Sequence, residues 1–227
     1  MSEDLDLLLS LQHGDSFFPT GSVAFSSGLE GLCRDGLVRN ADDLLGFIQG
    51  QVLGRWATCD LPAVLAAYRA HGNLAVVGAA DAALEAITLP LHLREGSRRS
   101  GAAMLGVHAK LGTAAAGPYR RMVRSGVVPG HLAIIQGLLW FHLGARESSV
   151  AAISAHATTV SMLGAAIRLS VVGHIDAQRI LATAHQTILG VLANLPSSDV
   201  DNFSSYGPAA EISIMRHETR ESRLFFN

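Results

Sequence analysis

Apolar residues recur every three or four positions over most of this chain, which is the spacing of α-helices with a buried face. After Asn40, such a series runs through Ala41, Leu44, Leu45, Ile48, Val52 and Leu53. Almost no segment alternates apolar and polar residues in the way that a half-buried strand does. The sequence therefore predicts an all-α fold, a helical bundle of about eight to ten helices.

Glycine, proline and capping residues divide this pattern into separate helices. Asn40 fits the N-cap of a helix that runs to about Thr58, and Asp60 followed by Pro62 indicates a new start. The other expected helices span residues 4–13, 23–34, 74–88, 95–112, 131–143, 148–172 and 176–195.

From Pro196 onward the chain becomes polar, is interrupted by glycine and proline, and ends in the apolar run Leu224-Phe225-Phe226 followed by Asn227. Neither an internal repeat nor a linker divides the remainder. We therefore expect a single domain over residues 1–227, in which residues 196–227 form a C-terminal tail. Because an apolar chain end is poorly accommodated by water, this tail is expected to depend on a partner.

Composition narrows the choice of partner. Apolar residues make up 49% of the 227 residues and charged residues 16%, so the chain needs a large core or a partner that covers apolar surface. The formal net charge of -2 gives no overall attraction for a phosphate backbone. Nucleic acid is therefore not an expected partner.

The same sequence favours a reducing compartment. Only Cys33 and Cys59 are present, and the first residues are acidic where an export signal would be basic, so a cytoplasmic location is expected. Residues 148–167 carry no Asp, Glu, Lys or Arg, but they include several Ser and Thr residues and His156. This stretch is too polar for a good membrane-spanning helix, so we predict a helix buried in the bundle and no membrane partner.

Sequence motifs for chemistry are scarce. The ten histidines include no pair three or four residues apart, the spacing that helical metal ligands typically have. Phosphate-binding loops and nucleophile elbows do not occur, and the adjacent Asp42 and Asp43 would point about 100° apart on a helix. We therefore predict no catalytic, cofactor-binding or metal-binding residue and a protein that is not an enzyme. Ligands from distant segments could still converge in the fold.

Two groups of basic residues stand at helical spacing, Arg94, Arg98 and Arg99 in the first and Arg120, Arg121 and Arg124 in the second. Such groups are commonly solvated faces of helices. The alternative interpretation is docking on an acidic partner.

Three segments carry the most specific patterns. In residues 7–30 a leucine-rich helix meets a turn with proline and glycine and ends in Phe25-Ser26-Ser27-Gly28-Leu29-Glu30. Residues 167–181 contain a basic-Leu stretch beginning at Ile167-Arg168, and residues 213–225 read SIMRHETRESRLF. Together, in this order, they resemble the urease accessory protein F family. The chain departs from the family pattern at Ser170, Val171, Val172, His174, Ala177 and Phe226-Asn227.

The resemblance implies an all-helical, non-catalytic chaperone that forms a homodimer. It implies a bridging role between accessory protein D, also called H, and the nickel-carrying GTPase, accessory protein G, in a complex that docks on apo-urease for nickel insertion. The protein would modulate GTPase-coupled metal transfer rather than perform chemistry. A helical-bundle metalloenzyme and a helical interaction domain unrelated to urease are the alternatives.

The matching motifs also suggest where partners bind. The expected partner-binding residues are Phe25, Ser27, Gly28, Glu30, Arg168, Asp176, Arg179, Met215, Arg216, His217, Glu218, Arg223, Leu224 and Phe225. The tail from Met215 to Phe225 is expected to become ordered when protein D docks, the alternative being that it packs on its own domain. Arg168 is expected either to face the GTPase or to form an intramolecular ion pair, and Glu30 to anchor the N-terminal turn or face solvent.

Overall fold

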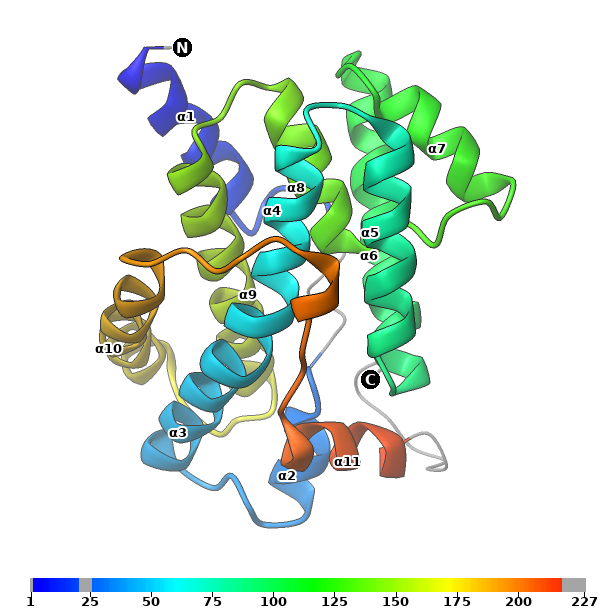
Figure 1. Ribbon diagram of the computed structural model, residues 1–227. Helices are drawn as coiled ribbons and strands as arrows, with labels where there is room; N and C mark the ends of the chain where they lie inside the picture. The colour runs from blue at the N-terminus through cyan, green and yellow to red at the C-terminus, as the bar shows by residue number, and fades with distance from the viewer. Residues whose placement is uncertain (1, 21–25, 218–227) are drawn as a thin grey trace.

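The computed structural model describes residues 2–20 and 26–217, apart from the side chain of His217. Within these residues the chain forms a bundle of helices and no strand, so the predicted all-α fold is confirmed (Figure 1). The α-helices are α1 (Glu3–Gly14), α2 (Leu29–Arg34), α3 (Ala41–Gln51), α4 (Leu61–Arg69), α5 (Leu74–Ile87), α6 (Leu91–Leu111), α7 (Ala116–Arg124), α8 (Leu132–His142), α9 (Glu147–Arg168), α10 (His174–Leu192) and α11 (Pro208–His217). A π-helix, η2 (Val52–Asp60), and a 3₁₀ turn, η3 (Val200–Asn202), complete them.

Helix α8 lies in the middle of the core and is apolar on nearly all sides, because α4, α5, α6 and α9 pack around it. Its closest approach is to α4. A side chain at Gly137 would overlap the carbonyl oxygen of Val64, so only glycine allows the two backbones to come this close. This crossing fixes the centre of the bundle.

Two hydrophobic clusters meet along α4. One side of this helix, including Val64 and Ala67, packs with α5, α6 and α8, while Leu61 and Leu65 pack with α3, α9 and α10. Trp56 extends the second cluster and donates its indole N–H to Ser154 Oγ at 3.1 Å. Because α4 contributes to both clusters, the two halves of the bundle share one continuous interior.

Helix α9 contains the stretch without Asp, Glu, Lys or Arg, residues 148–167, that was considered as a membrane-spanning candidate. By length and composition alone it could cross a membrane, and 56% of its most apolar window is buried inside the molecule. It packs against α1, α4, α8 and α10. The prediction of a helix in the bundle interior agrees with this placement.

The boundary predicted at Asp60 is wrong. Residues 41–69 form one unbroken helical run, in which α3 continues through η2 into α4. Asp60 has helical backbone angles and makes no capping hydrogen bond, because its carboxylate instead pairs with Arg55. The cap predicted at Asn40 is present, since its side chain accepts a hydrogen bond from the Asp43 N–H at 3.0 Å.

Two further boundaries differ from the prediction. Helix α2 begins at Leu29, because Gly28 before it adopts a φ of 86°, which is not a helical angle. The predicted start at Val23 lies outside the described residues. The segment after Pro196 was expected to be a polar tail, yet it contains η3 and α11. The helices α2 and α11, which carry parts of the N-terminal and C-terminal motifs, are in contact with each other.

Helix α1 has its polar and apolar faces reversed relative to an ordinary surface helix. Its buried residues are Asp6 and His13, whereas Leu7, Leu8 and Leu11 are each about 60% exposed. Asp6 accepts hydrogen bonds from the backbone N–H of Arg146 at 2.8 Å and from its Nε at 2.9 Å. Polar contacts therefore attach α1 to the start of α9.

Candidate partner-docking site

Two of the three family-like segments meet where α2 packs against α11 (Figure 1). Ser213 Oγ donates a hydrogen bond to the carbonyl oxygen of Gly28 at 2.9 Å. A Cβ atom on Gly28 would lie 2.8 Å from the Ala210 carbonyl oxygen, and one on Gly31 would overlap Ser213. We call this contact the α2–α11 junction. Its glycines are required because two helices touch there at backbone distance.

The segment that leads into α11 is held by the π-helix η2. The backbone N–H of Ser204 donates to the Thr58 carbonyl at 2.9 Å, and that of Tyr206 donates to the Gly54 carbonyl at 2.7 Å. Thr58 Oγ1 returns a hydrogen bond to the Ser204 carbonyl at 2.7 Å. The wider turn of a π-helix leaves carbonyl groups available to outside donors, and such turns often occur at functional sites. Here they dock residues 204–206.

Arg55 links this segment to the helices around it. Its guanidinium pairs with Asp60 at 3.2 Å and donates to Ser205 Oγ at 3.2 Å and to Thr88 Oγ1 at 3.3 Å. Ser205 Oγ in turn donates to Glu211 on α11 at 2.6 Å. Burial by itself would lower the pKa of Arg55, but the nearby carboxylates outweigh this effect and raise it. Arg55 therefore stays charged and ties η2, α5 and the C-terminal segment together.

A cavity of about 540 Å³ lies beside the junction. Its walls come from α1, α6, α8, α9 and α10, and they include Ser27, Arg55, Asp60, Trp140 and Arg168. A smaller cavity of about 70 Å³ shares the first three of these residues and reaches the α11 side chains of Glu211 and Ile214. The hollow thus connects the junction with Arg168 at the end of α9.

The predicted partner-binding residues fall into different environments. Met215 and Arg216 are exposed on α11, and Arg216 lies 3.9 Å from Asp35. Ser27 has a φ of 53° at the turn before α2 and lines the cavity. Glu30 is buried and pairs with Arg34 at 3.4 Å, so it anchors α2 rather than facing solvent.

The central segment places its residues near the start of α10. Asp176 and Arg179 form an exposed ion pair at 3.1 Å on one face of this helix. Arg168 is exposed on the cavity wall and its side chain runs back toward Gly164, with burial of the guanidinium lowering its pKa. Phe25, Glu218, Arg223, Leu224 and Phe225, together with the side chain of His217, lie outside the described residues.

The tail is structured as far as His217 in this single chain. Ser213 and Ile214 of α11 are buried against α2, so packing on its own domain describes this part better than ordering by a partner. Met215 to Phe225 were expected to become ordered on docking. This expectation can now apply only to the residues after α11, and those residues, 218–225, lie outside the described part of the chain.

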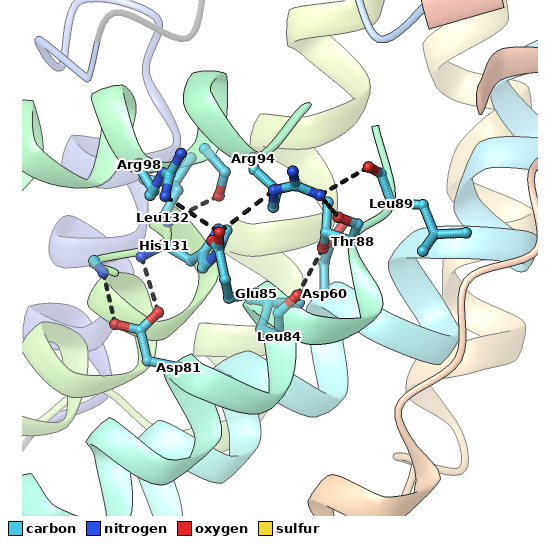
Figure 2. Close-up of polar contacts among 12 residues, drawn as sticks. Asp60, Asp81, Leu84, Glu85, Thr88, Leu89, Arg94, Arg98, His131 and Leu132 are labelled. Atoms are coloured by element: carbon cyan, nitrogen blue, oxygen red, sulfur yellow. Dashed lines mark hydrogen bonds and ion pairs between the residues drawn. The ribbon is translucent and has the colours of Figure 1, made fainter. Parts of the chain in front are cut away.

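The first arginine group does not form a free basic face (Figure 2). Arg94 and Arg98 of α6 both pair with Glu85 of α5, at 3.4 Å and 3.2 Å. Glu85 also contacts His131 Nε2 at 2.7 Å, and Asp81 one turn earlier accepts hydrogen bonds from the backbone N–H groups of Gly130 and His131. Burial raises the pKa of Asp81 and lowers that of His131. These groups join α5, α6 and the start of α8.

Histidines from distant segments do meet. The rings of His13 and His108 stack with centroids 5.4 Å apart, and those of His156 and His185 lie 6.4 Å apart. Burial, and then the neighbouring His13, lower the pKa of His108 to about 4. Among the residues that the structure describes, no group of three or more His, Cys, Asp or Glu side chains is placed to hold a metal ion.

Sequence reasoning missed the residues that hold the C-terminal segment. Gly54 and Arg55 lie inside a helical series, and nothing in their spacing marks them as contacts for residues 204–206. The available signal was Gly207-Pro208, a break followed by a helix start, which indicates a further helix after the tail begins.

Comparison with known proteins shows the family to which the sequence is similar. A family model described as UreF matches residues 38–185, more than half of the chain. The urease accessory protein UreF of Trichodesmium erythraeum is 31% identical over 233 residues, covering 100% of this chain and 98% of that protein. The corresponding proteins of Paenarthrobacter aurescens and Yersinia enterocolitica are 29% and 28% identical and are likewise covered over 100% and 98% of their lengths. The alternative of an interaction domain unrelated to urease is therefore wrong, and the chain belongs to the UreF family of urease accessory proteins.

Proposed function

We propose that this chain is a non-catalytic adaptor in the insertion of nickel into apo-urease. It bridges accessory protein D/H and the GTPase accessory protein G, and it modulates GTPase-coupled metal transfer in the cytoplasm as a homodimer. The observation that carries the proposal is the α2–α11 junction, where the N-terminal and C-terminal family motifs form one surface. A surface assembled from both ends of the chain suits recognition of a protein partner.

Accessory protein D/H is assigned to this junction. Met215 and Arg216 project from α11 while Ser213 and Ile214 fix the same helix to α2. The exposed pair therefore presents a thioether and a guanidinium on a firmly held element. Methionine and arginine are both enriched in protein interfaces.

Charge reversal on α11 tests this assignment. Met215→Glu and Arg216→Glu should each weaken binding of purified protein D/H by at least about tenfold, because they place a carboxylate in the contact. Arg39→Glu is the matched control, since Arg39 is 73% exposed and pairs with Asp43 much as Arg216, 67% exposed, pairs with Asp35. Unchanged affinity of both α11 variants would remove D/H from this surface.

Arg168 is assigned to the GTPase. Its position on the cavity wall, beside the start of α10, leaves the guanidinium reachable from outside. Arg168→Ala should weaken binding of protein G and leave binding of D/H intact, whereas Arg39→Ala should change neither. Equal affinity of Arg168→Ala and the unaltered chain for protein G would show that this arginine serves the fold alone.

A further inference from the structure

The second arginine group lies on the hairpin formed by α6 and α7. Arg120, Arg121 and Arg124 come from α7, and Lys110 comes from the last turn of α6. We call these four residues the α7 basic face. In Figure 1, α7 lies at the upper right of the bundle and α11 at its lower edge, so the face is well separated from the α2–α11 junction.

The α7 basic face differs from every other basic site in the described chain. Within residues 2–20 and 26–217, its four side chains are the only Lys or Arg side chains that lack an ion pair, a hydrogen bond or another polar contact. All other described arginines have such a partner within the chain. All unpaired Lys and Arg side chains of the described residues therefore lie on the hairpin formed by α6 and α7.

The fold holds these cations outward. Tyr119 and Ala116 are fully buried and fix α7, and the Tyr119 hydroxyl donates to Asp81 at 2.7 Å. With this side of α7 facing inward, Arg121 and Arg124 are exposed. Arg120 is half-buried and leans over α6, where its guanidinium passes near Gly106, one turn before the exposed Lys110.

Helix dipoles account for only part of this arrangement. A cation in the last turn of a helix is stabilised by the dipole, which applies to Lys110, Arg121 and Arg124. Arg120 lies one residue before the last turn of α7. The dipole stabilises one exposed cation at a helix end only weakly, so it does not explain four cations gathered without any carboxylate.

We propose that the α7 basic face docks a protein partner through a cluster of Asp and Glu side chains on that partner. Arginine forms planar, bidentate pairs with carboxylates and is more easily desolvated than lysine. The exposed apolar side chains of Leu111 and Val127 lie close to the face in sequence and provide the non-polar contacts that protein interfaces also need. Four cations can neutralise only a few phosphates of a duplex nucleic acid, and the formal net charge of -2 adds no overall attraction.

This inference rests on the proposed adaptor function and adds the chemistry of a second surface. An adaptor must hold two partners at once, and two well-separated surfaces allow this without competition. The acidic partner is therefore a component of the urease-maturation machinery other than the one that occupies the α2–α11 junction.

The test replaces the three arginines together, by Glu in one variant and by Gln in another, in the full-length chain. Affinity is measured for purified accessory protein D/H, accessory protein G and apo-urease at about 50 mM and about 300 mM salt. For either accessory protein G or apo-urease, the Glu variant should bind at least about tenfold more weakly at low salt, and the Gln variant should show an intermediate loss, whereas both should bind D/H normally. Both variants should also lose most of the salt dependence that the unaltered chain shows.

The control carries Arg39→Glu, because Arg39 is exposed, already pairs with Asp43 and is not among the expected partner-binding residues. It should bind that acidic partner normally. Unchanged affinity of the folded Glu and Gln variants for all three partners overturns the proposal. It is also overturned if only binding to anionic vesicles or duplex DNA depends on these arginines. A loss of D/H binding by Arg216→Glu in the same experiments would leave the α2–α11 assignment standing in either case.

Discussion

At the level of single residues, buried polar groups connect helices that apolar packing alone would leave free to slide. Asp81 accepts hydrogen bonds from Tyr119 and from the first N–H groups before α8, and thereby joins α5, α7 and α8. Asp6 performs the same task between α1 and α9. A buried carboxylate with several donors is stable only in one arrangement, so these residues specify how the helices pack.

Replacing Asp6 should therefore destabilise the fold more than replacing Leu8, which is the opposite of what the hydrophobicity of the two side chains would suggest. Asp6→Ala leaves the half-buried Ser149 hydroxyl and the Arg146 N–H without their acceptor, at a cost of about 1–3 kcal/mol in the free energy of unfolding. Leu8→Ser changes a side chain that is 62% exposed and should cost under about 0.5 kcal/mol. Urea denaturation of both variants measures this, and a larger loss for Leu8→Ser would show that α1 is oriented differently.

His108 should make the fold sensitive to acid. Its pKa is lowered from 6.5 to about 4 by burial and by His13, so the unfolded chain takes up a proton before the folded chain does. Stability contributed by the neutral imidazole is present above pH 6.5 and is lost as the pH falls toward about 4.

Urea unfolding at about pH 7.5 and about pH 5 tests this account. His108→Phe keeps a ring in the stack but cannot titrate, so it should show a smaller loss of stability between the two pH values. The missing hydrogen bond to Thr113 lowers its stability equally at both. The same pH dependence in the variant and the unaltered chain would exclude His108 as its source.

At the level of elements, the π-helix η2 interrupts the regular α-helix and binds residues 204–206 of the C-terminal segment. Gly54 allows the Tyr206 backbone to approach, since a Cβ atom there would overlap the Tyr206 carbonyl. Gly50, one turn earlier on α3, faces open space. The two glycines belong to one helical run, Gly50 in α3 and Gly54 in η2, and only Gly54 contacts the C-terminal segment.

Gly54→Ala should release the segment before α11, whereas Gly50→Ala should stabilise its helix by about 0.5–1 kcal/mol. Hydrogen exchange measures the first effect at the Tyr206 amide, which donates to the Gly54 carbonyl. Faster exchange there in Gly54→Ala, with Gly50→Ala unchanged, is the expected result. Equal protection of this amide in both variants would show that the contact with η2 does not hold the segment.

Most helices could be predicted from the sequence because their signals are local. Asn40 caps α3 as expected, and apolar spacing indicated the bodies of α5, α8 and α9. The predicted helix start at Asp60 was wrong because the Asp60 carboxylate pairs with Arg55 instead of capping a helix. The local sequence does not show which of these two roles an aspartate takes. Helix α11 was missed because its buried face meets α2, nearly the whole chain away in sequence.

At the level of the whole molecule, the candidate site could be predicted only where motif and geometry coincide. The family-like segments pointed to Ser27, Gly28 and Met215, and the fold brings α2 and α11 together. Arg94 and Arg98 form ion pairs with Glu85, whereas Arg120, Arg121 and Arg124 form none within the described part of the chain. The spacing of these arginines in the sequence could not show this difference, because ion pairing depends on which helices become neighbours.

The central claim is that the α2–α11 junction makes this chain an adaptor for urease maturation. The most direct measurement is the activity of purified apo-urease after incubation with nickel, carbon dioxide, GTP, accessory proteins D/H and G, and this chain. The unaltered chain and Arg39→Glu should support full activation, while Met215→Glu combined with Arg216→Glu should support little. Full activation by that double variant, or without the chain at all, would contradict the account.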